Sequence, residues 1–211
     1  MLGLPASTEI HKLITKKKVY EQFGAEMSAE RRRKFDTDIA RMTLTNEISP
    51  VSVNLAPGEN VQSFFVLHVA LKTRDFDAQN IAYLARLFGQ RLILVLEADN
   101  QWRLAVWQTK LLMTDWAAPD SFTTPLEGTN LDKAWDNIVS RIAGVELQHD
   151  KTLDEQLAAA SQREKLQKEI AKLEKLARAE KQPKRKFELV QKAKTLRQQL
   201  LLDEERNDRL A

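Results

Sequence analysis

The chain has 211 residues, of which 43% are hydrophobic and 30% are charged, with a formal net charge of +3 and no cysteine. These values fit one ordinary domain with a hydrophobic core, joined to a more solvated helical segment. The lack of cysteine excludes structural disulfides, thiolate metal sites and cysteine nucleophiles.

The histidines do not suggest a metal site. His11, His68 and His149 are far apart in the sequence and share none of the short spacings found in histidine-rich sites. We therefore predict no metal and no cofactor. The longest apolar runs, residues 64–71 and 92–98, are much shorter than the roughly 20 residues that span a bilayer. Because residues 1–10 also lack the apolar core of an export signal, we expect a soluble cytoplasmic protein without membrane contact.

Positive charge is concentrated at the C-terminal end. Residues 151–211 contain 16 Lys and Arg against 11 Asp and Glu, whereas residues 1–150 contain 17 against 19. A basic tail on a slightly acidic body predicts an acidic partner for the tail, with nucleic acid among the candidates.

Two helices are expected before residue 43. The first covers residues 7–23, with Ser7 or Thr8 as the N-cap, and the second covers residues 28–43, with Ser28 as the N-cap. The apolar positions at helical spacing are Ile10, Leu13 and Ile14 in the first, and Phe35, Ile39 and Met42 in the second.

A basic run, residues 31–34 (RRRK), lies in the first turns of the second helix. The positive end of the helix dipole disfavours cations there, so we interpret the run as solvated. The alternative is a patch that faces phosphate.

The middle of the chain changes to a strand pattern. Residues 43–49, 51–55 and 62–72 are rich in β-branched and aromatic side chains and are separated by Pro50 and by Pro57-Gly58. Residues 91–98 and 102–108 form two further strands around a turn at Asp99-Asn100. A helix is expected over residues 77–89, ending at Gly89, with Ile81, Leu84, Ala85 and Phe88 facing inward.

A last helix of the body follows the loop at residues 117–130. It is capped by Asn130, and its inward positions are Leu131, Trp135, Ile138, Val139 and Ile142, with Trp135 packing the helix onto the sheet. Helices and strands together predict an α+β domain over residues 1–148, built on a single mixed sheet flanked by helices.

Residues 149–211 predict an antiparallel, coiled-coil-like helical hairpin. Helical patterns lie on both sides of Pro183, which costs about 3 kcal/mol inside a helix, so two helices joined near residues 181–185 are favoured over one rod. A kinked single helix and a dimeric coiled coil are the alternatives. We also expect i,i+4 ion pairs Glu164–Lys168 and Glu174–Arg178. The hairpin packing residues predicted from the two seams are Leu166, Ile170, Leu173, Val190, Leu196 and Leu200, with Ala177, Phe187 and Ala193 in the same stripes.

Cations gather at and after the predicted bend. Between residues 181 and 197 only Glu188 opposes them. One interpretation is a solubilising helical surface; the other is a contact site for an acidic protein or for phosphate backbone, in which case binding to nucleic acid would depend steeply on salt. The residues predicted for this contact are Lys181, Lys184, Arg185, Lys186, Lys192, Lys194 and Arg197.

No motif predicts a reaction. The chain has no GxxxxGK[ST], GxGxxG, GxSxG or HExxH sequence. The order of elements from Ser28 to Trp107 resembles the core of PD-(D/E)xK nucleases, which carry a Glu-x-Lys on the third strand. Here the matching residues are Ala70-Leu71-Lys72, and the upstream acid would fall at Asn54, so the metal-binding carboxylates of that pattern are missing. We predict no catalytic residue.

His68 lies inside an apolar strand. No serine or acid close to it in the sequence completes a proton relay, so we expect a histidine of the core or the sheet face rather than a general base.

Several segments in a fixed order resemble a known family. They are GLPASTEIHKLITKKKVYEQF, KFDTDIARMTLTNEISPVSVNL, FVLHVALKTRDFD, LILVLEADNQWRLAVWQ and EKQPKRKFEL. Together they are similar to the bacterial family named domain of unknown function 4391. The resemblance implies no activity and no catalytic residues. It implies a context, because members look like small cytoplasmic proteins encoded beside helicases and DNA methyltransferases in restriction or phage-defence loci.

We therefore expect a non-catalytic accessory subunit of a DNA-processing assembly, which docks a larger protein, such as a helicase-type motor, through its C-terminal hairpin with possible DNA contact. The alternatives are a metal-dependent nuclease of the PD-(D/E)xK type, degenerate or with displaced acids, and a stand-alone nucleic-acid-binding protein.

Overall fold

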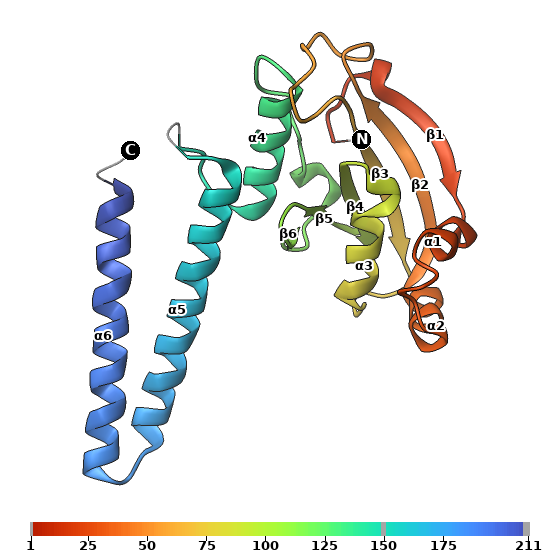
Figure 1. Cartoon of the computed structure of the whole chain (residues 1–211). Coiled ribbons are helices and arrows are strands. Elements are labelled where there is room, and N and C mark those ends of the chain that lie inside the picture. The colour runs from red at the N-terminus through yellow and green to blue at the C-terminus, as the bar shows by residue number, and fades with distance from the viewer. Residues whose placement is uncertain (1, 149–150, 209–211) are drawn as a thin grey trace. The chain divides into compact units, whose positions relative to one another are not determined.

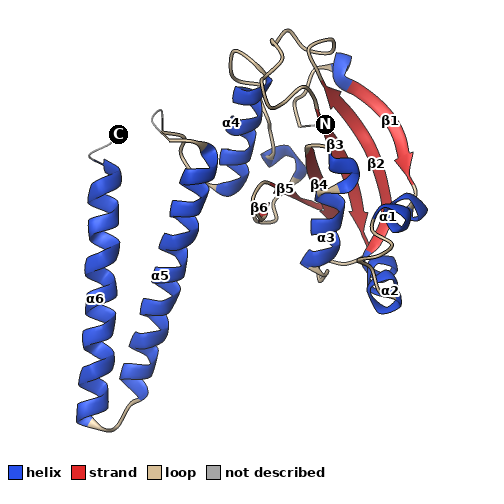
Figure 2. Ribbon diagram, in the orientation of Figure 1, coloured by secondary structure: helices blue, strands red, loops and turns tan. Residues whose placement is uncertain are grey.

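The computed structural model describes residues 2–148 and 151–208, with side chains up to residue 202. Its internal contacts divide the chain into two compact units, Met1–Gly144 and Val145–Ala211. The first unit contains a single six-stranded mixed sheet with helices, and the second contains two long helices (Figure 1, Figure 2). The predicted α+β fold with a C-terminal helical pair is therefore confirmed.

The strands of the sheet lie in the order in which they occur in the chain. β3 and β4 are parallel and are connected through α3, whereas all other neighbours are antiparallel. The sheet therefore contains one helical crossover and otherwise consists of antiparallel neighbours. The strands are β1 (Glu9–Ile14), β2 (Ile39–Ile48), β3 (Phe64–Leu71), β4 (Leu92–Ala98), β5 (Gln101–Trp107) and β6 (Leu111–Met113).

Side chains cap two helices of the first unit at the residues predicted from the sequence. Ser28 accepts a hydrogen bond from the backbone N–H of Arg31 at 3.2 Å, and Asn130 accepts one from Lys133 at 3.0 Å. These two predicted N-caps are confirmed, and each supplies an acceptor to an otherwise unpaired donor of the first turn. The N-cap predicted at Ser7 or Thr8 is wrong, because both residues lie in a 3₁₀ turn and the first α-helix begins after Thr15. The helices are α1 (Lys16–Gln22), α2 (Ala29–Asp38), α3 (Ala78–Ala85) and α4 (Leu131–Ala143), with 3₁₀ turns at Ala6–Thr8, Leu87–Gly89 and Pro119–Ser121.

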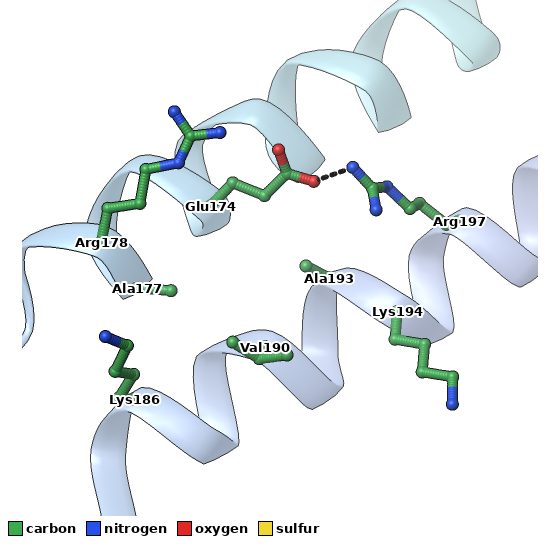
Figure 3. A pocket seen from close by; sticks show the side chains of 8 residues that line it. All are labelled: Glu174, Ala177, Arg178, Lys186, Val190, Ala193, Lys194 and Arg197. Atoms are coloured by element: carbon green, nitrogen blue, oxygen red, sulfur yellow. Dashed lines mark ion pairs between the residues drawn. The ribbon is translucent and has the colours of Figure 1, made fainter. Parts of the chain in front are cut away.

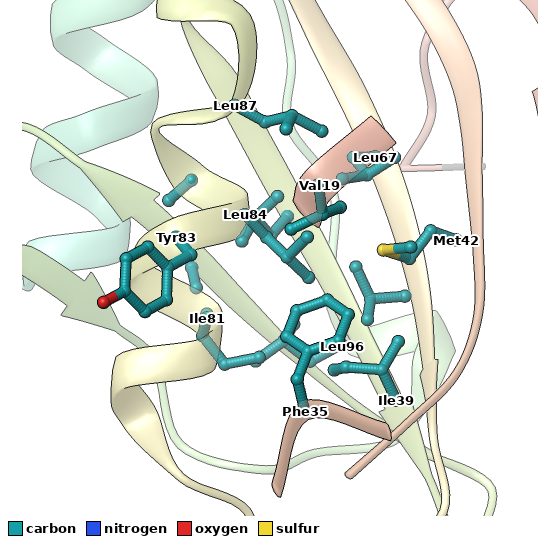
Figure 4. Packing of buried hydrophobic residues seen from close by; sticks show 14 of the residues in the cluster. Val19, Phe35, Ile39, Met42, Leu67, Ile81, Tyr83, Leu84, Leu87 and Leu96 are labelled. Carbon is teal, nitrogen blue, oxygen red and sulfur yellow. The ribbon is translucent and has the colours of Figure 1, made fainter. Parts of the chain in front are cut away.

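One face of the sheet forms the main hydrophobic core with α1, α2 and α3. Alternate residues of β3 and β4 supply its floor, because side chains along a strand point to opposite faces. Figure 4 shows how the helical residues close over this floor. The fully or nearly fully buried members include Val19, Phe35, Ile39, Met42, Leu67, Ile81, Leu84, Leu87 and Leu96.

The opposite face is covered in part by α4. Phe64 lies on that face, and its ring meets the indole of Trp135 edge-on with 5.5 Å between the ring centroids. All five residues predicted to face inward from this helix are buried. The prediction that Trp135 packs the helix onto the sheet is confirmed, and the sheet carries apolar residues on both faces.

The first predicted helix is wrong over half its length. Residues 9–14 form the edge strand β1, which pairs with β2, and only residues 16–22 are helical. Of the three apolar residues predicted on one face, Ile14 is buried and Leu13 is 55% exposed. The hydrogen bonds offered by β2 outweigh the local helical pattern, as tertiary context often does for short segments.

The second helix ends earlier than predicted, at Asp38, and Ile39 and Met42 belong to β2. The carboxylate of Asp38 is buried and accepts hydrogen bonds from the backbone of Asp77 and the amide of Asn80, both at 2.8 Å. Lys34 completes this set with an ion pair at 3.1 Å. These partners hold the end of α2 where β2 begins.

Two further predictions fail in the middle of the chain, and one strand was missed. The strand expected over residues 51–55 is a loop, with Val51 98% exposed. The short strand β6 was not predicted. α3 ends at Ala85, and Phe88 is 45% exposed because Leu87 occupies the inward position in the following 3₁₀ turn.

Candidate protein-binding hairpin

The second unit begins with a firmly capped helix, α5 (Leu153–Ala179). Thr152 and Glu155 form a capping box, in which the Thr152 hydroxyl accepts from the backbone of Glu155 and the carboxylate accepts from the backbone of Thr152 at 2.8 Å. Hydrogen bonds from the backbone and then from the side chain of Thr152 lower the pKa of Glu155. The buried amide of Gln156 donates hydrogen bonds to the backbone carbonyls of Gln148 and Lys151, which precede the helix.

The bend between the helices is shorter than predicted. It consists of residues 180–182, and Pro183 is the first residue of α6 (Pro183–Asp208). Proline suits this position because its missing N–H would have no partner within the helix. The backbone N–H of Gln182 donates to the Glu180 carboxylate at 2.8 Å, which fixes the turn. The two helices run antiparallel (Figure 1).

The buried seam of the hairpin differs in register from the prediction on α6. On α5, Leu166, Ile170 and Ala177 are buried, and Leu173 is half-buried. On α6, Ala193 is buried and Leu189, Leu196 and Leu200 are half-buried, whereas Val190 is 47% exposed and Phe187 is 64% exposed. The spacing of Leu189, Ala193, Leu196 and Leu200 is four, three, four, which keeps a seam aligned along a helix. Val190 and Phe187 therefore lie beside the seam.

Of the two ion pairs predicted along α5, one is confirmed and the other is wrong. Glu164 and Lys168 pair along α5 at 2.5 Å, as predicted. Glu174 pairs across the hairpin with Arg197 of α6, rather than along α5 with Arg178. Because the side chains of this cross-pair are partly exposed, it adds little stability.

A groove of about 580 Å³ lies between the two helices near the bend. Its apolar floor is formed by Ala177, Val190 and Ala193, which Figure 3 shows between the two ribbons. Its other described lining residues are Glu174, Arg178, Lys186, Lys194 and Arg197, so four cations surround it and its single acid is already paired with Arg197.

An exposed stripe on α6 continues from this groove. Phe187, Val190, Lys194, Arg197 and Leu201 recur at intervals of three and four, so they share one side of the helix. Phe187, Val190 and Leu201 each leave about half or more of their surface in water. We call these five residues the α6 stripe; it combines large apolar side chains with two cations.

The structure separates the predicted contact residues into two groups. Lys186, Lys194 and Arg197 line the groove, whereas Lys181 lies in the bend, and Lys184, Arg185 and Lys192 are exposed elsewhere on α6. Arg178 lines the groove but is not among the predicted contact residues, because its i,i+4 spacing predicts an ion pair with Glu174. Its place in the last turn of α5, opposite the basic start of α6, is the signal that identifies it.

The basic run at residues 31–34 is largely engaged within the first unit. Arg31 pairs with Asp77, and Lys34 pairs with Asp38. Arg32 lies 5.5 Å from the ring centroid of Tyr20 and donates to the carbonyl of Gly24. These contacts explain three of the four cations as packing residues of the unit.

The two positions considered for catalysis are also described. Lys72 donates to the backbone carbonyl of Asp36 at 2.8 Å. His68 lies 2.7 Å from the carboxylate of Glu97, a neighbour that sequence proximity could not identify because it comes from the parallel strand β4. Within the described residues, no three His, Asp or Glu side chains gather as metal ligands do, and no helix is both long and apolar enough to cross a bilayer.

The structure defines an α+β protein with one mixed sheet, followed by a helical hairpin that exposes apolar and basic side chains together. A family model matches residues 2–200, which cover nearly all of the first unit and most of the second, and its description is "Domain of unknown function (DUF4391)". The chain belongs to this family. A search of curated proteins and a search of solved structures each gave no match.

Proposed function

We propose that this protein is a non-catalytic accessory subunit of a bacterial DNA-processing assembly and that it binds a larger protein partner through its hairpin. The observation that supports this function is the α6 stripe, in which exposed Phe187, Val190 and Leu201 lie with cations beside a basic groove. The setting in restriction or phage defence, with a helicase-type motor as the partner, is the expectation that accompanies the family resemblance.

The apolar half of the stripe favours a protein partner. A surface that contacts only phosphate backbone gains from cations and gains nothing from exposed phenylalanine or leucine. A partner helix laid along the stripe would remove these side chains from water, which stabilises a complex by about 25 cal/mol for each Å² of apolar surface buried.

The basic half of the stripe and groove indicates the charge of that partner. Arg178, Lys186, Lys194 and Arg197 line the groove. Glu174, the acidic residue among the described lining residues, is paired with Arg197. A partner helix with acidic residues flanking an apolar face would complement both features. Complementary charge chiefly raises the association rate and selects the partner, whereas apolar contact supplies most of the affinity.

The experiment compares two double variants of the tagged full chain, each used to recover partners from its native host with quantitative mass spectrometry. Phe187→Glu with Val190→Glu disrupts the stripe. Thr195→Glu with Gln199→Glu is the matched control, because both residues are exposed on another side of the same helix. We expect one protein to be recovered with the wild type and the control, and to decrease on the order of tenfold with the stripe variant.

Two results would oppose the proposal. Equal recovery of every protein with both variants would show that the stripe is not the docking surface. Partner recovery that survives the stripe variant but is lost on nuclease treatment would indicate nucleic acid as the bridge. Far-UV circular dichroism of both variants confirms that each retains its helices.

A further inference from the structure

A second pocket, in the first unit, has a volume of about 590 Å³, which is within the range of small-molecule sites. It lies where the start of β3, the start of β4 and the end of β5 meet beyond the end of α3. The register confirms that these segments are neighbours, since Phe65 pairs with Leu92, and Ile93 pairs with Val106. The described lining residues are Asn60, Gln62, Ser63, Ala85, Arg86, Gly89, Gln90, Arg91, Trp107 and Gln108.

The lining of this pocket is mainly polar and cationic. It contains two guanidinium groups, four side-chain amides and one hydroxyl, and none of its described lining residues is acidic. Such a set offers many hydrogen-bond donors and two guanidinium groups, of which that of Arg86 lies 3.8 Å from the carboxylate of Glu26 outside the lining. It suits an anion with further polar groups, because arginine binds phosphate oxygens through a planar array of N–H donors.

Arg86 is held in place by aromatic rings. Its guanidinium carbon lies 4.9 Å from the ring centroid of Trp107, 5.6 Å from that of Tyr83 and 5.8 Å from that of Phe23. Its Nε donates to the carbonyl of Ala82 at 3.3 Å. A cation fixed in this way loses little conformational entropy when it binds a ligand.

Trp135 contacts two other lining residues of the pocket, Arg91 and Gln108. The Arg91 guanidinium lies 5.2 Å from the ring centroid of Trp135, and the indole N–H of Trp135 donates to the Gln108 side-chain oxygen at 3.1 Å. Trp135 is itself fully buried. The second cation and a neighbouring amide are therefore both oriented by the core.

We propose that this pocket binds a phosphorylated small molecule of the mononucleotide size class. Arg86 and Arg91 would hold the phosphate, since two guanidinium groups from separate elements match a doubly charged anion. The amides of Gln62, Gln90 and Gln108 would contact the polar remainder of the ligand. All of the described lining residues belong to the first unit, and the proposed binding is independent of the docking role proposed above.

The test is calorimetric titration of the full chain with the four ribonucleoside monophosphates, with ribose 5-phosphate and with inorganic phosphate. Each nucleoside without phosphate is the uncharged counterpart. We expect at least one monophosphate to bind about tenfold or more tightly than its nucleoside. Gln90→Glu places a carboxylate in the pocket at an exposed position, and Arg91→Gln removes one cation; each should weaken binding about tenfold.

Gln79→Glu is the matched control, because it adds the same charge at an exposed position in the first turn of α3, at the other end of that helix. It should leave binding unchanged. The proposal is overturned if none of the phosphate compounds binds at millimolar concentration, or if the nucleosides bind as tightly as their monophosphates. It is equally overturned if Gln79→Glu weakens binding as much as Gln90→Glu does.

Discussion

The two units of this protein use apolar side chains in opposite ways. In the first unit, large side chains are fully buried on both faces of the sheet: Phe35 on one face, and Phe64 and Trp135 on the other. In the hairpin, the buried seam is narrow and includes the small residues Ala177 and Ala193, and larger apolar residues stay exposed on α6. The first unit therefore encloses its own core, whereas the hairpin leaves large apolar side chains of α6 exposed.

Charges show the same contrast. In the first unit, buried Asp38 is satisfied by two hydrogen bonds and an ion pair, and Arg86 packs on three aromatic rings. In the hairpin, Lys184, Arg185 and Lys192 are exposed to solvent. Charged side chains that pack within a unit support its fold, and charged side chains that stand in water are available for association.

The largest expected effect is the loss of Trp135 from the first unit. Trp135→Ala removes the ring contact with Phe64, the hydrogen bond to Gln108 and the support of Arg91. We expect the free energy of unfolding of this unit to fall by about 3–5 kcal/mol. Urea denaturation followed by tryptophan fluorescence measures this unit alone, because all four tryptophans lie before residue 145.

Trp116→Ala is the control for that measurement. Trp116 is only partly buried and contacts Phe76 and Arg74 at the margin of the core. Its removal should cost about 1 kcal/mol. Equal costs for the two variants would show that α4 is not packed on the sheet as tightly as the buried ring of Trp135 indicates.

The next effect concerns the hairpin seam. Ile170→Asp with Leu173→Asp places two carboxylates in the seam, at a cost of about 3 kcal/mol or more, because a charge is buried without a partner. We expect most of the helical circular-dichroism signal of residues 153–202 to be lost while the fluorescence transition of the first unit keeps its midpoint. If both signals changed together, the two units would unfold as one.

Gln167→Asp with Ala171→Asp provides the comparison for the seam variant. Both residues are exposed on α5, so the same two charges remain in water. The loss should be within about 1 kcal/mol. Loss of partner recovery with the seam variant, but not with this control, would also support the proposed docking role.

Long, strongly periodic segments could be predicted from the sequence, whereas short ones could not. The helix after Asn130 follows a predicted cap, and the two helices of the hairpin follow from a long periodic pattern that Pro183 interrupts. Residues 9–14 were assigned to a helix because their partner strand is about 30 residues away in the sequence. A short apolar spacing fits a helix and an edge strand equally well, and only the pairing decides.

The functional surfaces were harder to predict than the fold. On α6, Leu189 lies half-buried in the seam whereas the adjacent Val190, which the sequence predicts there, is 47% exposed, and periodicity alone does not resolve this one-residue difference. The pocket with Arg86 and Arg91 is formed by three separate segments, residues 60–63, 85–91 and 107–108. No local motif links them, because the order of the strands in the sheet brings them together.

The smallest expected effect is the pH dependence due to Asp36. Burial alone would raise the pKa of Asp36, but a hydrogen bond from Tyr20 at 2.7 Å and the charges of Lys16 and Lys72 lower it. Since this pKa is lower in the folded chain than in the unfolded chain, the unfolded state takes up the proton first as the pH falls. The stabilising contribution is therefore present above about pH 4 and is lost progressively below it.

Asp36→Asn tests this expectation in the first unit. Urea midpoints followed by tryptophan fluorescence should fall less steeply with acid for Asp36→Asn than for the wild type, whereas the exposed Asp120→Asn should follow the wild type. The difference should be small and should shrink at high salt, because the Asp36 side chain is 54% exposed and the ion pair with Lys16 is screened. If the urea midpoints of the wild type and of Asp36→Asn fell equally with pH, the ionised Asp36 carboxylate would contribute nothing to the stability of the first unit.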